Sequence, residues 1–263
     1  ISEDDVGNFF DHPFSARLYL DDAMLIFDDV FVPNERVFMK CEWSFAADYA
    51  YVFADFHRLS SDACQAIENE MLCGMAALMA EYNGLERAPH IRDMLTWFTM
   101  YAEMTDVLGV AACEHCVPAE PGSDLVIPNP MYSNMGKWFG SSNYHQATKY
   151  LQDIAGGIVA TIPTFEDWQN PGLRPLMEKY LGGKNGIPTE HRIRLIKGIR
   201  DYTSSYEGVL RLHAEGSLAA QSLSVYNLAD WGRYKAAAKR AVRIEDKTEH
   251  PFFNQLPEFP PKL

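Results

Sequence analysis

The chain has 263 residues, of which 47% are hydrophobic and 22% charged, and its formal net charge is −13. This balance predicts a globular chain with a sizeable core, and it argues against nucleic acid or an anionic membrane surface as the main partner. No apolar run approaches the roughly 20 residues of a membrane span, and no secretory signal opens the chain. The five scattered cysteines do not form a secreted disulfide framework, so we expect a reducing, cytoplasmic setting.

The first 37 residues contain short segments typical of β-strands. Residues 16–20, 23–27 and 30–32 are strand-like apolar runs. Two or three strands do not form a stable sheet by themselves. We therefore expect residues 1–37 to be the end of a central β domain whose other strands lie elsewhere. Because the chain also opens without a methionine, we expect it to be a piece or a subunit of something larger.

Residues 38–245 have the apolar spacing of long helices. The first helix is expected from about residue 42 to 82, where Asn83–Gly84 is typical of a C-terminal cap. Thr189 is expected to be the N-cap of a later helix. Further helices are expected at about 90–116, 131–160, 189–212 and 217–242, with 167–180 partly helical.

The pattern therefore predicts a mainly α fold, a bundle of long antiparallel helices with a short N-terminal β remnant. The Pro-rich tail at 246–263 is expected to wrap a neighbouring subunit or to be loosely held.

His57 and Cys64 are seven residues apart in the first expected helix. Seven residues are about two turns, so both side chains fall on one face, roughly 10 Å apart along the axis. Only Ser60 and Ser61 lie between them on that face. A thiolate and an imidazole that flank a gap lined by small residues fit an iron–sulfur cluster. The alternative is that Cys64 is a buried small hydrophobe and His57 a hydrogen-bonded core histidine.

Gly156 and Gly157 interrupt the helix expected at 131–160, shortly before Thr161 and Thr164. Glycine permits close approach of the backbone, and freed N–H groups with threonine hydroxyls suit a pyrophosphate. The alternative is a role in helix packing and in the turn.

Two further motifs are weaker. Cys113 and Cys116 form a C-x-x-C pair at a predicted helix end, which suits a metal or a redox dithiol. Without a second such pair, incidental helix cysteines are the alternative.

His145 and Lys149 lie in a patch of aromatic and cationic residues that suits a flavin or an acyl-CoA, with ordinary core packing as the alternative.

Three segments carry a resemblance to a known family. Ala23-Met-Leu-Ile-Phe-Asp-Asp-Val-Phe-Val-Pro33 resembles the point where a barrel strand passes to a long helix in the acyl-CoA dehydrogenase-like fold. Residues 151–161 and 178–192 resemble the branch that contains 4-hydroxybutyryl-CoA dehydratase/vinylacetyl-CoA isomerase and, more distantly, the 4-hydroxyphenylacetate 3-monooxygenases. The resemblance covers nearly the whole chain but only the C-terminal half of those proteins.

The resemblance implies FAD and, in the dehydratases, a 4Fe-4S cluster held by three cysteines and one histidine. His57 and Cys64 match the ligand pair of the C-terminal half, so the other cysteines would come from a partner chain that carries the N-terminal half. His57 would also act as a base once released from iron. Gly156, Gly157, Thr161 and Thr164 would bind FAD.

The chain also departs from the dehydratase pattern. Ser61 and Gln65 stand where the family has a tyrosine and a lysine. The family's catalytic glutamate falls near residues 210–211, where there is none, and Glu207 and Glu215 are out of register. Asp22 occupies a second acidic position and is a candidate catalytic residue.

Three functions stay open at this point. The first is a subunit or fragment of a flavin and iron–sulfur lyase/isomerase that dehydrates a hydroxyacyl-CoA or related substrate by radical chemistry. The second is a reduced-flavin-dependent aromatic monooxygenase in which His57 and Cys64 are structural. The third is a catalytically degenerate scaffold subunit. In each case the resemblance implies a homo- or hetero-oligomer.

Overall fold

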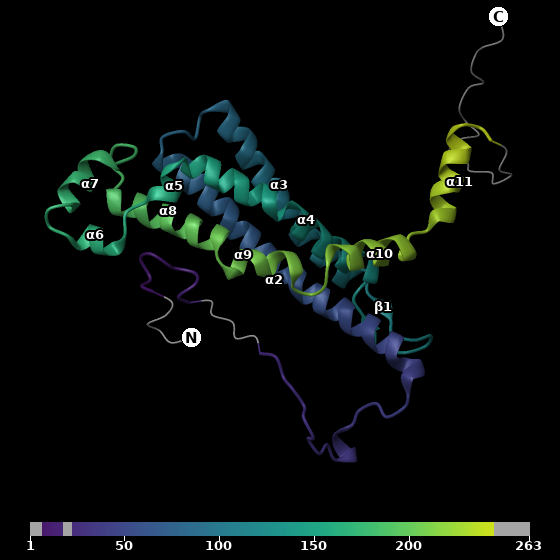
Figure 1. Ribbon diagram of the computed structural model, residues 1–263. Coiled ribbons are helices and arrows are strands. Elements are labelled where there is room, and N and C mark those ends of the chain that lie inside the picture. Colours follow the sequence, from purple (N-terminus) through teal and green to yellow (C-terminus); the bar gives the residue numbers. More distant parts are fainter. Residues whose placement is uncertain (1–6, 18–22, 245–263) are drawn as a thin grey trace, which may run out of the picture. The chain divides into compact units, whose positions relative to one another are not determined.

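The computed structural model describes residues 7–17 and 23–244, and the chain divides into two compact units, residues 1–225 and 226–263 (Figure 1). In chain order the helices and strands are η1 (Asn34–Arg36), η2 (Trp43–Phe45), α2 (Ala46–Tyr82), α3 (Pro89–Glu114), β1 (Val117–Pro118), β2 (Val126–Ile127), α4 (Pro130–Ala155), α5 (Ile158–Thr161), α6 (Phe165–Gln169), α7 (Arg174–Tyr180), α8 (Thr189–Ser204), α9 (Tyr206–His213), α10 (Leu218–Leu228) and α11 (Trp231–Ala241). The prediction of a mainly α fold is therefore confirmed.

The core of the first unit lies between α2, α3, α4 and α8. Helices α2, α3 and α4 pack against one another, and α8 packs against α2 and α4. Along the chain, α2, α3 and α4 reverse direction in turn (Figure 1). Each contributes large apolar side chains that are almost fully buried, such as Met79, Phe98, Leu151 and Ile196. Burial of this apolar surface is the main stabilisation of the bundle. Within the described ranges, no helix has the length and apolar character needed to cross a bilayer.

The ends of the long helices follow the predicted signals. Gly84 follows α2 with a φ of 68°, and Gly156 ends α4 with a φ of 81°. Both values lie in the left-handed region that glycine adopts without strain. Asn129 caps α4, because its side chain accepts hydrogen bonds from the backbone N–H groups of Met131 and Tyr132.

Two predicted helices are each split in the structure. The helix expected at 189–212 is interrupted at Ser205, whose φ of −101° and ψ of −178° are extended. The helix expected at 217–242 ends at Leu228, and a new helix begins after Asp230, whose side chain accepts from the Arg233 N–H. Thr189 is the first residue of α8 rather than its N-cap, and its hydroxyl donates to the Glu178 carbonyl.

The strands expected at 23–27 and 30–32 are absent from the described structure. Strand sequences form a ladder only when partner strands are present, and the described chain supplies none to this segment. Its apolar side chains are exposed instead, with Met24 88% and Phe27 73% accessible. Residues 18–20 of the first expected strand, Asp22 and the tail at 246–263 lie outside the described residues. The small antiparallel β1–β2 pair was not predicted.

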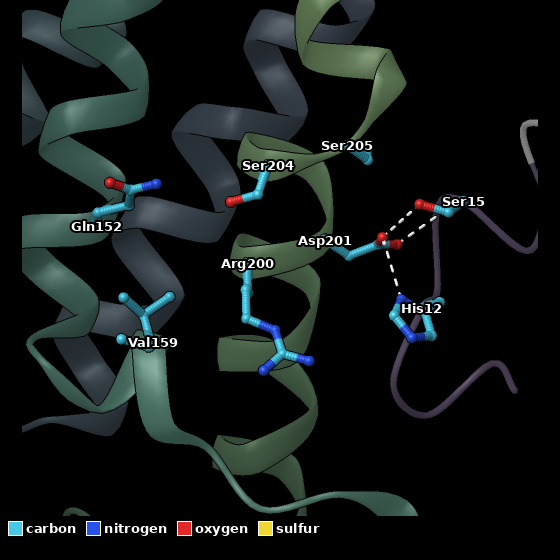
Figure 2. A pocket seen from close by; sticks show the side chains of 9 residues that line it. His12, Ser15, Gln152, Val159, Arg200, Asp201, Ser204 and Ser205 are labelled. Atoms are coloured by element: carbon cyan, nitrogen blue, oxygen red, sulfur yellow. Dashed lines mark hydrogen bonds and ion pairs between the residues drawn. The ribbon is translucent and has the colours of Figure 1, made fainter. Parts of the chain in front are cut away.

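Residues 8–17 are attached to α8 by two carboxylates. Asp201 on α8 accepts from the backbone N–H groups of Phe14 at 2.8 Å and Ser15 at 2.9 Å, and from the Ser15 hydroxyl. Asp11 lies 2.7 Å from the fully buried Lys197 Nζ. These contacts hold an N-terminal segment against α8, and Figure 2 shows those between Asp201 and Ser15.

Candidate functional site

His57 and Cys64 lie on the exposed side of α2. Both are accessible, and Cys64 is a free thiol. The ring of Phe53, one turn earlier, lies 5.2 Å from the His57 ring between centroids. Within the described residues, neither side chain lies in the core of the helical bundle. Two metal-binding donors thus face outward from one helix.

The two serines between them face different ways, contrary to the expectation that both line the gap. Ser60 is exposed and donates to the Phe56 carbonyl. Ser61 is buried, and its hydroxyl donates to Glu215 Oε2 at 3.0 Å. On a helix, the residues three and four positions after His57 are rotated to opposite sides of it. Ser60 therefore turns to the surface, and Ser61 turns to the bundle.

Ser61 belongs to what we call the buried polar cluster, formed by Ser61, Asp62, Gln65, Lys137 and Glu215. Gln65 Nε2 donates to Ser61 Oγ at 3.1 Å, and Lys137 Nζ lies 3.1 Å from Glu215 Oε2. Asp62 and Lys137 are fully buried, and the Glu215 side chain is 20% exposed. A carboxylate–ammonium pair is thus held behind the α2 face that bears His57 and Cys64.

Burial dominates the electrostatics of this cluster. It raises the pKa of Asp62 to about 8; the attraction of Lys137 opposes that shift, and the charge of Glu215 adds to it. Neither carboxylate oxygen of Asp62 has a hydrogen-bond partner among the described residues. Burial also lowers the pKa of Lys137, which the charge and hydrogen bond of Glu215 oppose. Asp62 is therefore mainly neutral at pH 7, next to a charged pair.

Two glycines of α4 make room for the cluster. A Cβ on Gly136 would lie 2.6 Å from the Asp62 carboxyl group, and a Cβ on Gly140 would lie 1.7 Å from Gln65 Oε1. Side chains at these two positions would displace Asp62 and Gln65. The glycines allow α2 and α4 to approach closely at this level of the bundle.

The polar layer continues along α2 toward its N-terminus. Arg58 Nη1 donates to Asn134 Oδ1 at 2.5 Å, and Asn134 Nδ2 donates to Asp55 Oδ1 at 3.3 Å. Burial raises the pKa of Asp55, although its hydrogen bond to Asn134 and the charge of Arg58 oppose that shift. The buried side of α2 near His57 is thus an extended hydrogen-bonded network rather than apolar core.

Glu215 is the residue that sequence reasoning missed. In the sequence, Glu215 is out of register with the family's catalytic glutamate, yet the fold brings its side chain against Ser61. Its φ of 58° is in the left-handed region. Its backbone carbonyl accepts from Gln221 at 3.4 Å, which helps to hold the turn between α9 and α10. A sequence signal for a buried polar cluster was available, because polar residues recur at helical spacing on α4. These residues are Ser133, Asn134, Lys137 and Ser141, and all of them are buried.

The Gly156–Gly157 turn separates α4 from α5. A Cβ at either glycine would meet no other atom within 4 Å, so the backbone there is open to a ligand. Thr161 is exposed and ends α5. Thr164 is the N-cap of α6, where it forms a capping box with Asp167. Its hydroxyl therefore already has a structural role.

The remaining candidates do not join a common site. His145 and Lys149 are exposed on α4. Cys113 and Cys116 are exposed free thiols at the end of α3. Asp22 is outside the described residues. Among residues 7–17 and 23–244, no group of three or more His, Cys, Asp or Glu side chains is arranged to hold a metal.

Comparison with known proteins identifies the class. Residues 46–243 match the family described as HpaB, 4-hydroxyphenylacetate 3-hydroxylase C terminal, so the chain belongs to this family. Its characterised relatives include a 4-hydroxybutyryl-CoA dehydratase and several monooxygenases.

Individual relatives come from both branches. The chain is 26% identical to 4-hydroxybutyryl-CoA dehydratase/vinylacetyl-CoA-Δ-isomerase of Clostridium aminobutyricum over 239 residues, 85% of this chain and 48% of the relative. It is 30% identical to the oxygenase component of 4-hydroxyphenylacetate 3-monooxygenase of Thermus thermophilus over 258 residues, 91% of this chain and 51% of the relative. The chain thus spans about half the length of these curated relatives.

The solved structures that this chain resembles also include both dehydratases and monooxygenases. An oxygen-tolerant archaeal 4-hydroxybutyryl-CoA dehydratase from N. maritimus superposes with a TM-score of 0.75 at 30% identity, over 86% of this chain and 45% of the other. The oxygenase component of 4-hydroxyphenylacetate 3-monooxygenase, complexed with FAD and 4-hydroxyphenylacetate, superposes with a TM-score of 0.79 at 26% identity, over 91% and 51%.

Proposed function

We propose that this chain is the C-terminal helical part of an enzyme that uses FAD and a 4Fe-4S cluster to dehydrate or isomerise a hydroxyacyl-CoA or a related substrate. The observation that carries the proposal is the pair His57 and Cys64, exposed two turns apart on one face of α2. Membership of a family that includes 4-hydroxybutyryl-CoA dehydratase supports it.

His57 and Cys64 could supply two of the four ligands of such a cluster. One sulfur and one imidazole nitrogen are accessible, and Ser60, the small residue between them, leaves space on the surface. Because the described residues contain no third donor nearby, two cysteines would come from the polypeptide that carries the N-terminal half. When bound, the cluster would supply a Lewis acid for a leaving hydroxyl, and FAD would supply one-electron chemistry.

The chain's own residues would hold and move protons. The His57 imidazole would hold the cluster as a ligand, and it could accept a proton from substrate when it is not a ligand. Glu215, hydrogen-bonded by Ser61 and paired with Lys137, is the carboxylate that the fold places behind this face. Gly156, Gly157 and the exposed Thr161 would accommodate FAD through open backbone and a hydroxyl group, and Thr164 would hold the following turn.

The test is the iron and flavin content of the complete enzyme, purified without oxygen. Wild type is expected to be brown and oxygen-sensitive, with both iron and FAD. Cys64→Ser and His57→Ala are expected to lose iron while they keep FAD. Cys113→Ser, which changes another exposed free thiol on a neighbouring helix, is the matched control and should keep its iron. A yellow, iron-free wild type would overturn the proposal.

A second candidate is a reduced-flavin-dependent aromatic monooxygenase. Two observations favour it: 30% identity to the Thermus oxygenase over 91% of this chain, and Ser61 and Gln65 at positions where the dehydratase pattern differs. It predicts hydroxylation of a phenol supported by a flavin reductase and NADH, with no iron bound. If neither activity nor iron changes in His57→Ala, the chain is instead a scaffold for an active partner.

A further inference from the structure

The motif Cys113-Glu-His-Cys116 at the end of α3 has no part in the proposed function. Both of its thiols are free and exposed. Cys113 lies in the last turn of the helix, and Cys116 directly precedes strand β1. Two accessible thiols three positions apart invite the question of whether they can react with each other.

The backbone between the two cysteines forms a single turn. The Cys116 N–H donates to the Cys113 carbonyl at 3.2 Å, and His115 between them has a φ of −103° and a ψ of 29°. In such a turn the first and fourth Cα atoms lie within about 7 Å, and the side chains at these positions are nearly eclipsed. A disulfide usually joins residues whose Cα atoms are about 4.4–6.8 Å apart. The turn therefore presents both thiols on one side, with backbone spacing suited to a disulfide.

Groups outside the cysteines hold this turn in place. The carbonyl of the fully buried Ala112 accepts from the Asn129 backbone N–H at 2.8 Å. The Asn129 Nδ2 donates to the His115 carbonyl at 3.0 Å, and the same side chain caps α4. Beyond the second cysteine, strand β1 is paired with β2. A backbone that is fixed on both sides loses little further freedom when a disulfide closes, so closure is favoured.

The donor set favours thiol chemistry over metal binding. Structural zinc and iron–sulfur sites take four protein ligands. In the part of the chain that the structure describes, no third His, Cys, Asp or Glu joins the two thiols in a metal-binding arrangement. The His115 ring, although it lies within the motif, stacks near Tyr132, with 5.5 Å between the ring centres. The reaction open to two adjacent thiols is reversible oxidation to a disulfide.

The carbonyl end of a helix also changes the balance between dithiol and disulfide. At a helix N-terminus, the helix dipole stabilises a cysteine thiolate and therefore stabilises the reduced form of a C-x-x-C pair. Helix α3 instead directs its negative end at this pair, because Cys113 lies in its last turn. The reduced form lacks that stabilisation, so the disulfide is favoured relative to sites of the N-terminal kind.

We propose that Cys113 and Cys116 are a redox-active dithiol, which a low-molecular-weight disulfide such as glutathione disulfide converts to an intramolecular disulfide. One cysteine thiolate attacks a sulfur of glutathione disulfide, which forms a mixed disulfide and releases one glutathione thiolate. The other cysteine thiolate attacks the protein sulfur of that mixed disulfide, closes the bond and releases the second glutathione. Two cysteine thiols are oxidised and one glutathione disulfide is reduced, and the two protons pass from the cysteines to the two glutathione thiolates.

The test is anaerobic incubation of the complete enzyme in glutathione redox buffers, followed by alkylation of the remaining thiols and mass spectrometry. Residues 93–137 form one tryptic peptide, which contains both cysteines of the motif and no other cysteine. In wild type this peptide is expected to lose two hydrogen atoms and to take up neither the alkylating reagent nor glutathione.

Single variants measure the advantage of having both thiols. In Cys113→Ser and in Cys116→Ser the remaining thiol is expected to end as a mixed disulfide with glutathione. At millimolar reduced glutathione, the wild-type disulfide should form at glutathione disulfide concentrations at least about 10-fold lower, because the second thiol acts at a high effective concentration. Cys41→Ser removes an exposed thiol outside the motif and is the matched control, which should behave as wild type.

A further variant tests the turn itself. Asn129→Asp keeps an oxygen that can cap α4 but removes the Nδ2 donor to the His115 carbonyl. The disulfide should then form roughly 2- to 10-fold less readily, as expected for the loss of one hydrogen bond.

Two results would overturn the proposal. One is uptake of a glutathione by each cysteine of the motif without an internal bond. The other is a motif that stays reduced in buffers that convert Cys41 to its mixed disulfide. Neither result bears on iron or flavin content, so a failure here is distinguishable from a failure of the proposed function.

Discussion

Replacing Lys137 with methionine tests whether the buried polar cluster is an obligatory charge pair. Lys137→Met keeps the length of the side chain but removes the ammonium that lies 3.1 Å from Glu215 Oε2. The carboxylate would then be left in the bundle with only the Ser61 hydroxyl as its donor among the described groups. An uncompensated buried charge is far more costly than the loss of an exposed ion pair.

The expected cost follows from the exposure of the two partners. Removing one member of a buried pair costs about 3–5 kcal/mol. Because 20% of the Glu215 side chain is accessible and water solvates part of its charge, we expect the lower end, about 3 kcal/mol. Lys137→Met combined with Glu215→Gln removes both charges, so the double variant should recover at least about 2 kcal/mol relative to the sum of the single variants.

Urea unfolding of the complete enzyme with each variant gives these differences. Arg174→Met is the matched control, because Arg174 and Glu178 form an ion pair in which both side chains are 50% exposed. Because the Arg174 guanidinium also lies 4.7 Å from the centre of the Trp168 ring, that control should cost up to about 1 kcal/mol. A Lys137→Met cost below about 1 kcal/mol, or strict additivity in the double variant, would refute the reasoning.

Three further predictions concern single positions. Asp62→Asn should stabilise the protein increasingly as the pH rises from 3.8 to about 8, because the folded state keeps Asp62 protonated while the unfolded chain ionises; urea unfolding at pH 5 and pH 8 measures this. Thr164→Ala should cost about 1 kcal/mol in thermal unfolding through loss of the capping box. Gly183→Ala should cost about 2 kcal/mol or more in the same assay, because its Cβ would lie 2.0 Å from the Tyr82 carbonyl oxygen.

Each of these has a direct check. Asp106→Asn, at an exposed position on α3, should show no growing difference across the same pH range. Thr164→Ser should keep most of the cap. Gly182→Ala is the control for Gly183, since its Cβ would be no closer than 3.6 Å to any other atom. Equal effects of the two glycine substitutions would contradict the steric argument.

The helices could be predicted because their signals are local. Apolar spacing, Asn83–Gly84 and Gly156 each act within a few residues, and they set the ends of α2 and α4 where the sequence placed them. The breaks at Ser205 and before Asp230 were not predicted, because no proline or glycine stands there. The strand prediction for residues 23–32 was wrong because strand formation is not local: a strand needs partner strands, and this sequence does not supply them.

The candidate site was predicted in part. The spacing of His57 and Cys64 gave a common face, and the structure adds that this face is exposed. The side to which Ser61 turns depends on where α4 packs, which spacing within one helix does not determine. Glu215 comes from a turn 154 residues away from Ser61, so only the tertiary fold brings them together.

The attachment of Phe14 and Ser15 to Asp201 spans 186 to 187 residues of chain. Closing so long a loop is entropically costly before the helices have assembled, so this contact is expected to form late in folding. Opening of this segment would also withdraw Phe10 from the core and leave the buried Lys197 without Asp11. Hydrogen exchange at these two amides would therefore report the opening of the pocket that His12, Ser15 and Asp201 line (Figure 2).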